Sequence, residues 1–461
     1  MFFEQKAPDL SRAITKLAKW SSAPGIEFSE GFTNALALLE RPTGNVFVTG
    51  KAGTGKSTLL QYFRNTTDKS VAVLAPTGVA AVNVDGQTIH SFFNFRPNVT
   101  ESNVRRAVAE KQELYKKLDA IVIDEASMVR ADLLDCIDKS LRLNRSQKEP
   151  FGGVQMLFFG DLHQLPPVVT ESEREALQGA YDSPYFFDSN ALRKSPVQVI
   201  ELEKVYRQKD AAFIDILNAI RSNTADQAHL SALNSRVSNQ ITGPDGELCV
   251  TLTATNDVAD NINHQQLRSI RRQPYYFEAT WIGGPDNRQP APARLELKPG
   301  CQVMLLNNDS AGGWVNGTVG AVTGFSTDAD GRTLVDVRLQ NGEQVSVNRF
   351  KWTLYKYALD PKTKTIQSTE SGSYSQYPLR LAWAVTVHKS QGKTFDRVHI
   401  DSGRGMFAPG QLYVALSRCR TLDGITLARP IQPHEILTDS CVVEFLANDA
   451  RQERLAPTQT E

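Results

Sequence analysis

The fold of this chain is decided by the stretch NVFVTGKAGTGKS, which runs from Asn45 to Ser57. Its apolar start is rich in β-branched residues and ends at a glycine, so it predicts a short buried strand. The pattern Gly-x-x-x-x-Gly-Lys-Ser follows and leads into the helix-prone segment TLLQYF. A strand, a glycine-rich turn and a helix N-terminus together are the setting of a phosphate-binding loop, whereas a chance lysine in a glycine-rich loop would lack these flanks.

The loop assigns a first group of residues to nucleotide binding. Backbone N–H groups of such a loop point inward and surround a polyphosphate at the positive end of the helix. Lys56 is expected to reach the β and γ phosphates, and the Ser57 hydroxyl to hold Mg²⁺. The nucleotide-binding residues are Gly50, Ala52, Gly53, Thr54, Gly55, Lys56, Ser57 and Thr58.

Length and composition limit the class of protein. A chain of 461 residues is too long for one ordinary core, so we expect two to four domains. Lys plus Arg and Asp plus Glu both number 51, so the net charge neither predicts nor excludes nucleic acid. The 5 cysteines show no C-x-x-C spacing, which argues against a zinc site or a disulfide framework and suits a reducing cytosol. No apolar run approaches the ~18 residues of a membrane span, so we expect a cytoplasmic protein that does not act on a membrane.

Strands alternate with helices through the first part of the chain. Further buried strands are predicted at residues 71–74, 120–124 and 154–161, with a long helix at 133–143. This alternation indicates a parallel α/β sheet, whose ligands bind at the carboxyl ends of the strands. The residues between Asn83 and Leu118 exceed what one crossover needs, so we predict a small insertion there.

The second part of the chain predicts another α/β block with a different domain inside it. The block begins near Val197 with VQVIEL and continues with a helix at residues 211–221. Short alternating strands and close turn signals between residues 297 and 377 indicate an inserted β-barrel. The expected segments are an N-terminal segment (1–30), a first α/β domain (31–190) with its insertion at about 86–118, a second α/β domain (191–296 and 378–446), the barrel (297–377) and a polar, frayed tail (447–461).

Strand ends carry the residues suited to phosphate chemistry. Asp124 suits a Mg²⁺ contact, and Glu125 suits the base that orients and deprotonates the attacking water. Gln164, in GDLHQLPP, can bond a γ-phosphate and water at once, so it suits a sensor of hydrolysis. Arg207 and Arg418 are candidates for stabilising the γ-phosphate charge across a cleft between domains. Taken alone, an acidic pair is often a solvated turn and an arginine is often a surface residue, so these assignments rest on the strand context.

Seven motifs occur in one order: GKAGTGKS, LAPTGVAA with TIHSFF, VIDEASM, GDLHQLPP, LEKVYRQ, TVHKSQG and YVALSR. This series resembles the superfamily 1 helicases, and specifically the petite-integration-frequency (Pif) family of the 5′-to-3′ branch. The stretch from MVRADLLDCIDKSLR to KEPFGGVQ is similar to an insert that marks this family. The resemblance covers about residues 28–430.

The resemblance implies two RecA-like domains with ATP between them and single-stranded DNA across their tops. It implies that Lys56, Ser57, Asp124, Glu125, Gln164, Arg207 and Arg418 form the ATPase set. It also implies that the insertion is a wedge domain and that the barrel is an SH3-like domain. The residues implied in DNA binding are Thr77, Gly78, Thr88, His90, Phe92, Thr386, His388 and Lys389.

One feature departs from the family pattern, and several of the residues implied in DNA binding also have a structural interpretation. Relatives often carry an adenine-reading glutamine ahead of the phosphate loop, but the corresponding run SEGFTNALALL has none, and Asn34 is its possible substitute. We expect only one of the three rings of Phe92, Phe93 and Phe95 to stack on DNA bases. Clustered phenylalanines more often belong to a hydrophobic core. Read alone, His90 and His388 are also more often structural than ligands.

We therefore expect an ATP- and Mg²⁺-dependent 5′-to-3′ DNA helicase that acts on single-stranded DNA and single/double-strand junctions. The resemblance further implies a monomer in a bacterial-type cytosol or nucleoid, with roles in DNA replication, repair and telomere maintenance. Two alternatives remain open: a single-strand translocase that unwinds poorly, and a nucleotide-dependent switch that acts on a protein partner.

Overall fold

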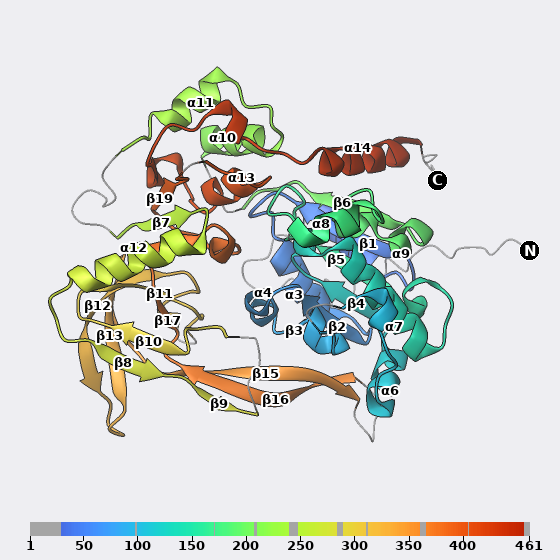
Figure 1. Cartoon of the computed structure of the whole chain (residues 1–461), viewed down its shortest axis with the longest axis horizontal. Coiled ribbons are helices and arrows are strands. Elements are labelled where there is room, and N and C mark those ends of the chain that lie inside the picture. Colours follow the sequence, from blue (N-terminus) through green and yellow to red (C-terminus); the bar gives the residue numbers. More distant parts are fainter. Residues whose placement is uncertain are drawn as a thin grey trace, which may run out of the picture.

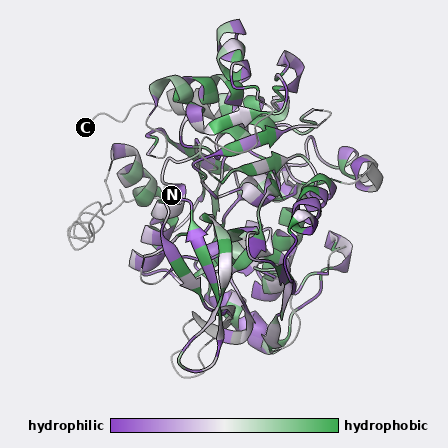
Figure 2. Ribbon diagram, turned by 90° about the vertical axis from the view of Figure 1, so that its left-hand side faces the viewer, coloured by the Kyte–Doolittle hydropathy of each residue, from purple (hydrophilic) through white to green (hydrophobic). Residues whose placement is uncertain are grey.

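The computed structural model describes residues 29–96, 99–169, 171–206, 210–238, 248–283, 289–309, 312–359, 366–403 and 405–455. These residues form two α/β lobes side by side and a β domain beneath the second lobe (Figure 1). We call residues 29–206 lobe 1, residues 210–274 with 382–438 lobe 2, and residues 275–381 the β domain. Hydrophobic residues gather on the strands inside the lobes, whereas the outer helices carry more hydrophilic ones (Figure 2). The α/β architecture expected from the sequence is confirmed.

Lobe 1 is built on six parallel strands in the order β3-β2-β4-β5-β1-β6. The strands are β1 (Asn45–Gly50), β2 (Val71–Ala75), β3 (Gln87–Thr88), β4 (Ala120–Ile123), β5 (Gln155–Phe159) and β6 (Val197–Leu202). The main helices are α2 (Glu30–Leu39), α3 (Lys56–Thr66), α4 (Gly78–Asn83), α7 (Ala131–Arg145), α8 (Glu171–Gln178) and α9 (Asn190–Lys194). Neighbouring strand residues such as Phe47 and Val48 belong to separate apolar clusters on the two faces of the sheet. Both faces are therefore covered, as parallel sheets require.

Strand β6 corrects the expected boundary between the two α/β domains. Its segment VQVIEL was assigned to the second domain, but it pairs in parallel with all of β1, from Asn45↔Val197 to Gly50↔Leu202. Alternation of apolar residues predicts a strand without saying which sheet it joins, because that depends on pairing across 147 residues or more of chain. Lobe 1 thus extends to about residue 206, and lobe 2 begins at α10 (Ala211–Arg221).

The predicted insertion in lobe 1 is present between β3 and β4. It contains α5 (Ile89–Phe93), a short turn of helix at Glu101–Asn103 and α6 (Ala109–Lys117). Helix α6 contacts the long arm of the β domain described below.

Lobe 2 carries a smaller parallel sheet in the order β18-β7-β19-β20. Its strands are β7 (Val250–Thr253), β18 (Ala384–Thr386), β19 (Val398–Asp401) and β20 (Ile425–Leu427), and its other helices are α11 (Gln227–Asn234), α12 (Asn256–Ser269), η6 (His388–Ser390) and α13 (Gln411–Leu416). The turn after β7 reads Ala254-Thr255 and lacks glycines, so lobe 2 has no phosphate loop at its corresponding strand end.

The β domain is antiparallel and begins earlier than expected. Its sheets are β10-β8, β14-β13-β12-β11-β17 and β15-β16-β9. The strands are β8 (Tyr275–Glu278), β9 (Thr280–Ile282), β10 (Arg294–Leu297), β11 (Gln302–Leu305), β12 (Val319–Thr327), β13 (Thr333–Leu339), β14 (Gln344–Val347), β15 (Phe350–Leu359), β16 (Ile366–Gln376) and β17 (Leu379–Leu381). The predicted start at residue 297 is corrected to about 275, because β9 pairs with β16 inside the expected barrel and β8 pairs with β10, which ends at its predicted first residue. Strands β15 and β16 form an arm that reaches toward α6 (Figure 1).

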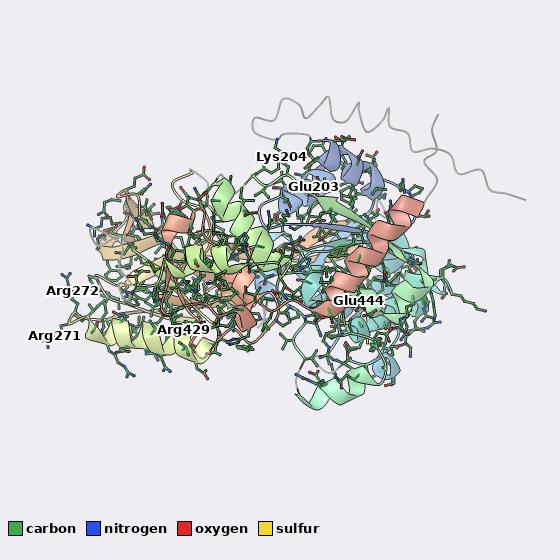
Figure 3. The ribbon with its side chains drawn as sticks, turned by 90° about the horizontal axis from the view of Figure 1, so that it is seen from above. Glu203, Lys204, Arg271, Arg272, Arg429 and Glu444 are labelled. Carbon is green, nitrogen blue, oxygen red and sulfur yellow. The ribbon has the colours of Figure 1, made fainter. Side chains whose placement is uncertain are left out.

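The expected frayed tail is also corrected. Residues 447–455 continue α14 (Ser440–Leu455), while residues 456–461 lie outside the described part of the chain. The helix leaves lobe 2 and lies along lobe 1, where Figure 3 labels Glu444 on it. The Phe445 ring stacks on Phe187 with 4.2 Å between centroids, and Val442 joins the lobe 1 core. Val442, Phe445 and Leu446 lie at positions i, i+3 and i+4, so the first turns of α14 present an apolar face to lobe 1. Among the described helices, none is long and apolar enough to cross a membrane.

The pairing of β6 generates a testable prediction. A fragment of residues 29–206 should fold as a soluble unit, whereas residues 29–190 should aggregate, because loss of β6 leaves the backbone edge and apolar faces of β1 uncovered. Circular dichroism and thermal unfolding of the two fragments measure this. Equal, cooperative unfolding of both would contradict the assignment of β6 to lobe 1.

Candidate nucleotide site between the two lobes

The phosphate loop has the backbone that its glycines allow. Gly55 precedes α3 with a φ of 89°, a left-handed conformation that favours glycine. A Cβ on Gly50 would lie 2.6 Å from the Leu202 carbonyl oxygen, so only glycine fits there. Lys56 Nζ donates to the carbonyl oxygens of Gly50 at 2.6 Å and Lys51 at 3.0 Å. Burial lowers the pKa of Lys56, although nearby carboxylates, Asp161 foremost, act in the opposite direction.

Two adjacent carboxylates face this lysine at the end of β4, as predicted. Burial, and then the charge of Glu125, raises the pKa of Asp124 to about 7. Burial also raises the pKa of Glu125, against the opposing effects of Lys56 and Arg418. Glu125 has a φ of 52°, a left-handed conformation that is uncommon for a residue with a side chain. Paired buried carboxylates beside one lysine leave excess negative charge, which a cation would compensate.

The residues assigned to Mg²⁺ fit a site completed by a nucleotide. Ser57 lies in the first turn of α3 next to the phosphate loop, and Asp124 follows β4. Among the described residues, no group of three or more His, Cys, Asp or Glu side chains is arranged to hold a metal. Mg²⁺ is usually held by one or two carboxylates together with phosphates and water, so the small protein contribution is the expected one.

The loop after β5 brings Gln164 and a second carboxylate to the same place. Asp161 is 1% exposed and accepts hydrogen bonds from Arg221 Nη2 at 3.3 Å and the Tyr413 hydroxyl at 3.2 Å. Burial alone would raise the pKa of Asp161, but Arg221 and Lys56 outweigh it and the pKa is lowered. Asp161 therefore stays ionised, between a lysine of lobe 1 and an arginine of lobe 2.

Lobe 2 supplies an amide to the water-activating carboxylate. Gln391, just after η6, donates from Nε2 to Glu125 Oε2 at 3.0 Å and to Gln164 Oε1 at 3.2 Å. One side chain thus joins both hydrolytic candidates of lobe 1 to the segment 386–392 of lobe 2.

The structure describes Arg418 but not Arg207, the other arginine predicted to stabilise the γ-phosphate charge. Arg418 is 2% exposed, donates to Val414 O at 2.9 Å and Ser417 Oγ at 2.8 Å, and lies near enough to Glu125 to oppose the rise in its pKa. Hydrogen bonds within lobe 2 therefore hold its guanidinium near Glu125 of lobe 1. Arg207 lies outside the described residues, but the preceding Tyr206 donates its N–H to Gly53 O at 2.8 Å, at the phosphate loop.

Four residues of the site were not singled out from the sequence: Asp161, Arg221, Gln391 and Tyr413. Three of them lie inside motifs that the sequence displays, namely GDLHQLPP, TVHKSQG and YVALSR. Arg221 ends α10 without any motif, so only the folded chain reveals that it meets Asp161.

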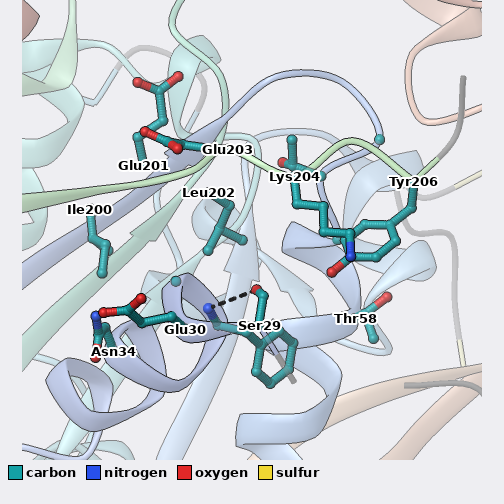
Figure 4. A pocket seen from close by; sticks show the side chains of 15 residues that line it. Ser29, Glu30, Asn34, Thr58, Ile200, Glu201, Leu202, Glu203, Lys204 and Tyr206 are labelled. Carbon is teal, nitrogen blue, oxygen red and sulfur yellow. Dashed lines mark hydrogen bonds between the residues drawn. The ribbon is translucent and has the colours of Figure 1, made fainter. Parts of the chain in front are cut away.

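A cavity of about 710 Å³ opens beside the phosphate loop. Asn34 and Glu30 of α2 line one side, and Lys204 and Tyr206 line the other (Figure 4). Lys204 Nζ lies 5.4 Å from the centroid of the Tyr206 ring. Thr58 and Asn34 both lie on this cavity, where a nucleoside attached to bound phosphates would extend.

The residues expected to contact DNA lie on turns at strand ends. Thr77 caps α4, which begins at Gly78, and its hydroxyl accepts a hydrogen bond from Ala80 N at 3.2 Å. Thr88 caps α5 in the same way, and its hydroxyl accepts a hydrogen bond from Ser91 N at 3.2 Å. Thr386 accepts from Lys389 N at 3.3 Å. These threonines therefore shape their turns by capping them.

Charge at these turns favours an anion on the lobe 2 side. Burial lowers the pKa of His90 and His388, so both are neutral at pH 7 and offer hydrogen bonds rather than charge. Lys389 is exposed beside Arg380, and the pKa of Lys393 is lowered to about 8 by burial and by Arg380. Asp260 acts in the opposite direction on Arg380 and Lys389, and a bound anion would stabilise the positive charge that remains in excess.

Phe92 does not match its expected role. It is 1% exposed and packs edge-on against Phe93 and Tyr115, whose hydroxyl donates to the Phe92 carbonyl at 3.0 Å. Its predicted stacking on DNA bases is wrong for this structure, because its ring has no free face. Phe95 is half-buried and stacks on Phe93, so it is the most accessible of the three rings.

Comparisons with known protein families agree with this arrangement. The family model described as PIF1-like helicase matches residues 32–229, and the one described as DNA helicase Pif1, 2B domain, matches residues 286–325. The chain is 35% identical to the human ATP-dependent DNA helicase PIF1, over 87% of this chain and 61% of that protein. It is 32% identical to the ATP-dependent DNA helicase Pif1 of Bdellovibrio bacteriovorus, over 91% of this chain and 92% of that protein. The chain thus spans less than two thirds of the human relative.

Solved structures match over nearly the whole chain. Bacteroides sp. Pif1 in complex with ADP-AlF4 is 37% identical and matches with a TM-score of 0.84, covering 93% of this chain and 98% of that one. Bacteroides Pif1 bound to ssDNA is 36% identical with the same coverage, but its TM-score is 0.68. Identity and coverage are nearly the same for the two structures, so the lower score reflects a different conformation, and the present structure is more similar to the first.

The burial of Phe92 yields a prediction that separates packing from DNA contact. Phe92→Ala should lower the stability of lobe 1 by about 3–5 kcal/mol, because it leaves a cavity among aromatic rings. Phe95→Ala, as the control, should cost far less because that ring is only half-buried. Denaturant unfolding measures both. Unchanged stability of Phe92→Ala together with weakened binding of single-stranded DNA would restore the stacking role.

Proposed function

Because this chain belongs to the PIF1-like helicase family, we propose that it is an ATP-dependent DNA helicase that moves 5′ to 3′ on single-stranded DNA and unwinds duplexes. The observation that carries the proposal is the position of Gln391. It joins Glu125 and Gln164, the hydrolytic candidates of lobe 1, to the segment of lobe 2 that holds Thr386, His388 and Lys389. Hydrolysis and strand contact are therefore linked through one short segment.

The geometry supports hydrolysis of ATP in the cleft. Glu125 accepts a proton from the water that attacks the γ-phosphorus, and Gln164 orients that water. Lys56 and Arg418 place positive charge on either side of the transferred group, where phosphoryl transfer spreads negative charge. Mg²⁺, when held by Ser57 and Asp124 with the nucleotide phosphates, supplies further neutralisation of that charge.

The cavity beside the loop accommodates the nucleoside. Asn34 offers both an amide donor and an acceptor, which is the pair of groups needed to read the edge of adenine. The Tyr206 ring on the opposite wall offers an apolar face for the base.

The DNA strand is proposed to cross the strand-end turns of both lobes. Neutral histidines and capped turns offer hydrogen bonds to phosphates without reading sequence, and the cluster of Arg380, Lys389 and Lys393 adds charge. The similarity to a Pif1 protein that was crystallised with ssDNA supports this partner. We also propose action at single/double-strand junctions.

We further infer that one chain suffices for activity, since both walls of the cleft come from the same chain. A reducing cytosol is the proposed location, because none of the five cysteines, all of which the structure describes, is in a disulfide. The first alternative function, a single-strand translocase with little unwinding, would use the same nucleotide site. A switch acting on a protein partner would have no use for a link between hydrolysis and the basic turns.

A first prediction tests the water-activating role. Glu125→Gln should lower ATP turnover by at least about 100-fold, because the amide cannot accept the proton. Binding of a fluorescent ATP analogue should persist, since the phosphate loop is intact. Steady-state ATPase assays and titrations measure the two quantities. Turnover close to that of the unchanged protein would remove Glu125 from its role.

A second prediction tests the partner and the polarity. Single-stranded DNA should stimulate ATP turnover, and strand displacement should be faster for duplexes with a 5′ overhang than with a 3′ overhang. Turnover that ignores DNA would favour the switch. DNA-stimulated turnover without displacement from either overhang would favour the translocase.

A further inference from the structure

A tyrosine of lobe 2 reaches into the phosphate loop of lobe 1. Tyr413, on α13, is 4% exposed, and its hydroxyl accepts the N–H of Ala52 at 3.0 Å. The same hydroxyl donates to Asp161 Oδ2 at 3.2 Å. Both of its partners belong to lobe 1, so this one hydroxyl bridges the phosphate loop and the loop of Gln164 from across the cleft.

The bridge continues as a chain of hydrogen bonds to the water-activating carboxylate. Asp161 Oδ2 also accepts from Gln164 Nε2 at 3.4 Å. Gln164 Oε1 in turn accepts from Gln391, which donates to Glu125 as well. The order is thus phosphate loop, Tyr413, Asp161, Gln164, Gln391 and Glu125. Tyr413 and Gln391 come from lobe 2, and the other members come from lobe 1.

The chain forms only when the lobes are in close contact. Gly410, at the start of α13, has a φ of 71°, and a Cβ there would lie 2.3 Å from His163 O and 2.4 Å from Gln164 O. The first turn of α13 therefore rests directly on the loop that carries Asp161 and Gln164. Hydrogen bonds near 3 Å weaken steeply when the donor and acceptor separate by about 1 Å, so a small opening of the cleft would break both bonds of Tyr413.

We propose that Tyr413 is a positioning residue that makes ATP hydrolysis depend on closure of the two lobes. With the lobes together, its hydroxyl holds Ala52 and Asp161, and Asp161 holds Gln164 in line with Gln391 and Glu125. With the lobes apart, the phosphate loop and the hydrolytic side chains lose their lobe 2 partners together. This inference rests on the proposed ATPase function of the same cleft.

The inference is tested with Tyr413→Phe, which removes the hydroxyl and keeps the ring. The turnover number for DNA-stimulated ATP hydrolysis should fall about tenfold, because the variant loses both positioning hydrogen bonds of the hydroxyl, while the KM for ATP stays within about twofold. Tyr374→Phe is the matched control, because Tyr374 is equally buried and its hydroxyl donates to Ala291 O at 2.8 Å away from the cleft. Thermal unfolding of both variants reports any general loss of packing.

A double-mutant cycle with Gln391→Ala tests whether the two lobe 2 residues act through one chain. If they do, the double variant should lose less turnover than the product of the two single losses. Normal turnover of Tyr413→Phe, an equal loss in Tyr374→Phe, a loss confined to KM, or strictly multiplicative losses would each overturn the inference. Absence of DNA-stimulated turnover in the unchanged protein would instead contradict the proposed function.

Discussion

The buried contact between Asp161 of lobe 1 and Arg221 of lobe 2 is the interaction on which the cleft depends. The two side chains meet at 3.3 Å with almost no exposure, and Arg221 also reaches Glu201 at 3.3 Å. A charge that is removed from water is costly unless an opposite charge and hydrogen bonds compensate it. Each lobe therefore carries a buried charge that the other lobe satisfies, and the site is complete only when both are present.

Glycines allow close backbone contacts at defined points, both within lobe 1 and between the lobes. Gly50 lets the phosphate loop pass next to β6, and Gly410 lets α13 rest on the loop after β5. The result is a cleft in which Lys56, Asp161 and Glu125 lie together in a setting of low polarity. Burial lowers the pKa of Lys56 and raises the pKa of Glu125 against the opposing charges around them, whereas for Asp161 the charges of Arg221 and Lys56 outweigh burial and the pKa is lowered.

The two lobes are also connected away from the cleft. Helix α14 leaves lobe 2 and packs Val442 and Phe445 against lobe 1, and the arm of β15 and β16 reaches from the β domain toward α6. Any relative movement of the lobes must therefore bend the segment before α14 or shift its contact. These connections link segments that are hundreds of residues apart in the chain.

The sequence by itself determined the elements and most of the chemistry, because strand ends and glycine-rich turns are local patterns. It placed Lys56, Asp124, Glu125 and Gln164 in the first α/β domain and Arg418 in the second, as the structure has them. Only the tertiary structure decided that β6 joins lobe 1, that Phe92 is core, and that Arg221, Gln391 and Tyr413 meet the phosphate loop and its neighbours. Those outcomes depend on which surfaces of distant segments pack together, and no local pattern of residues records that choice.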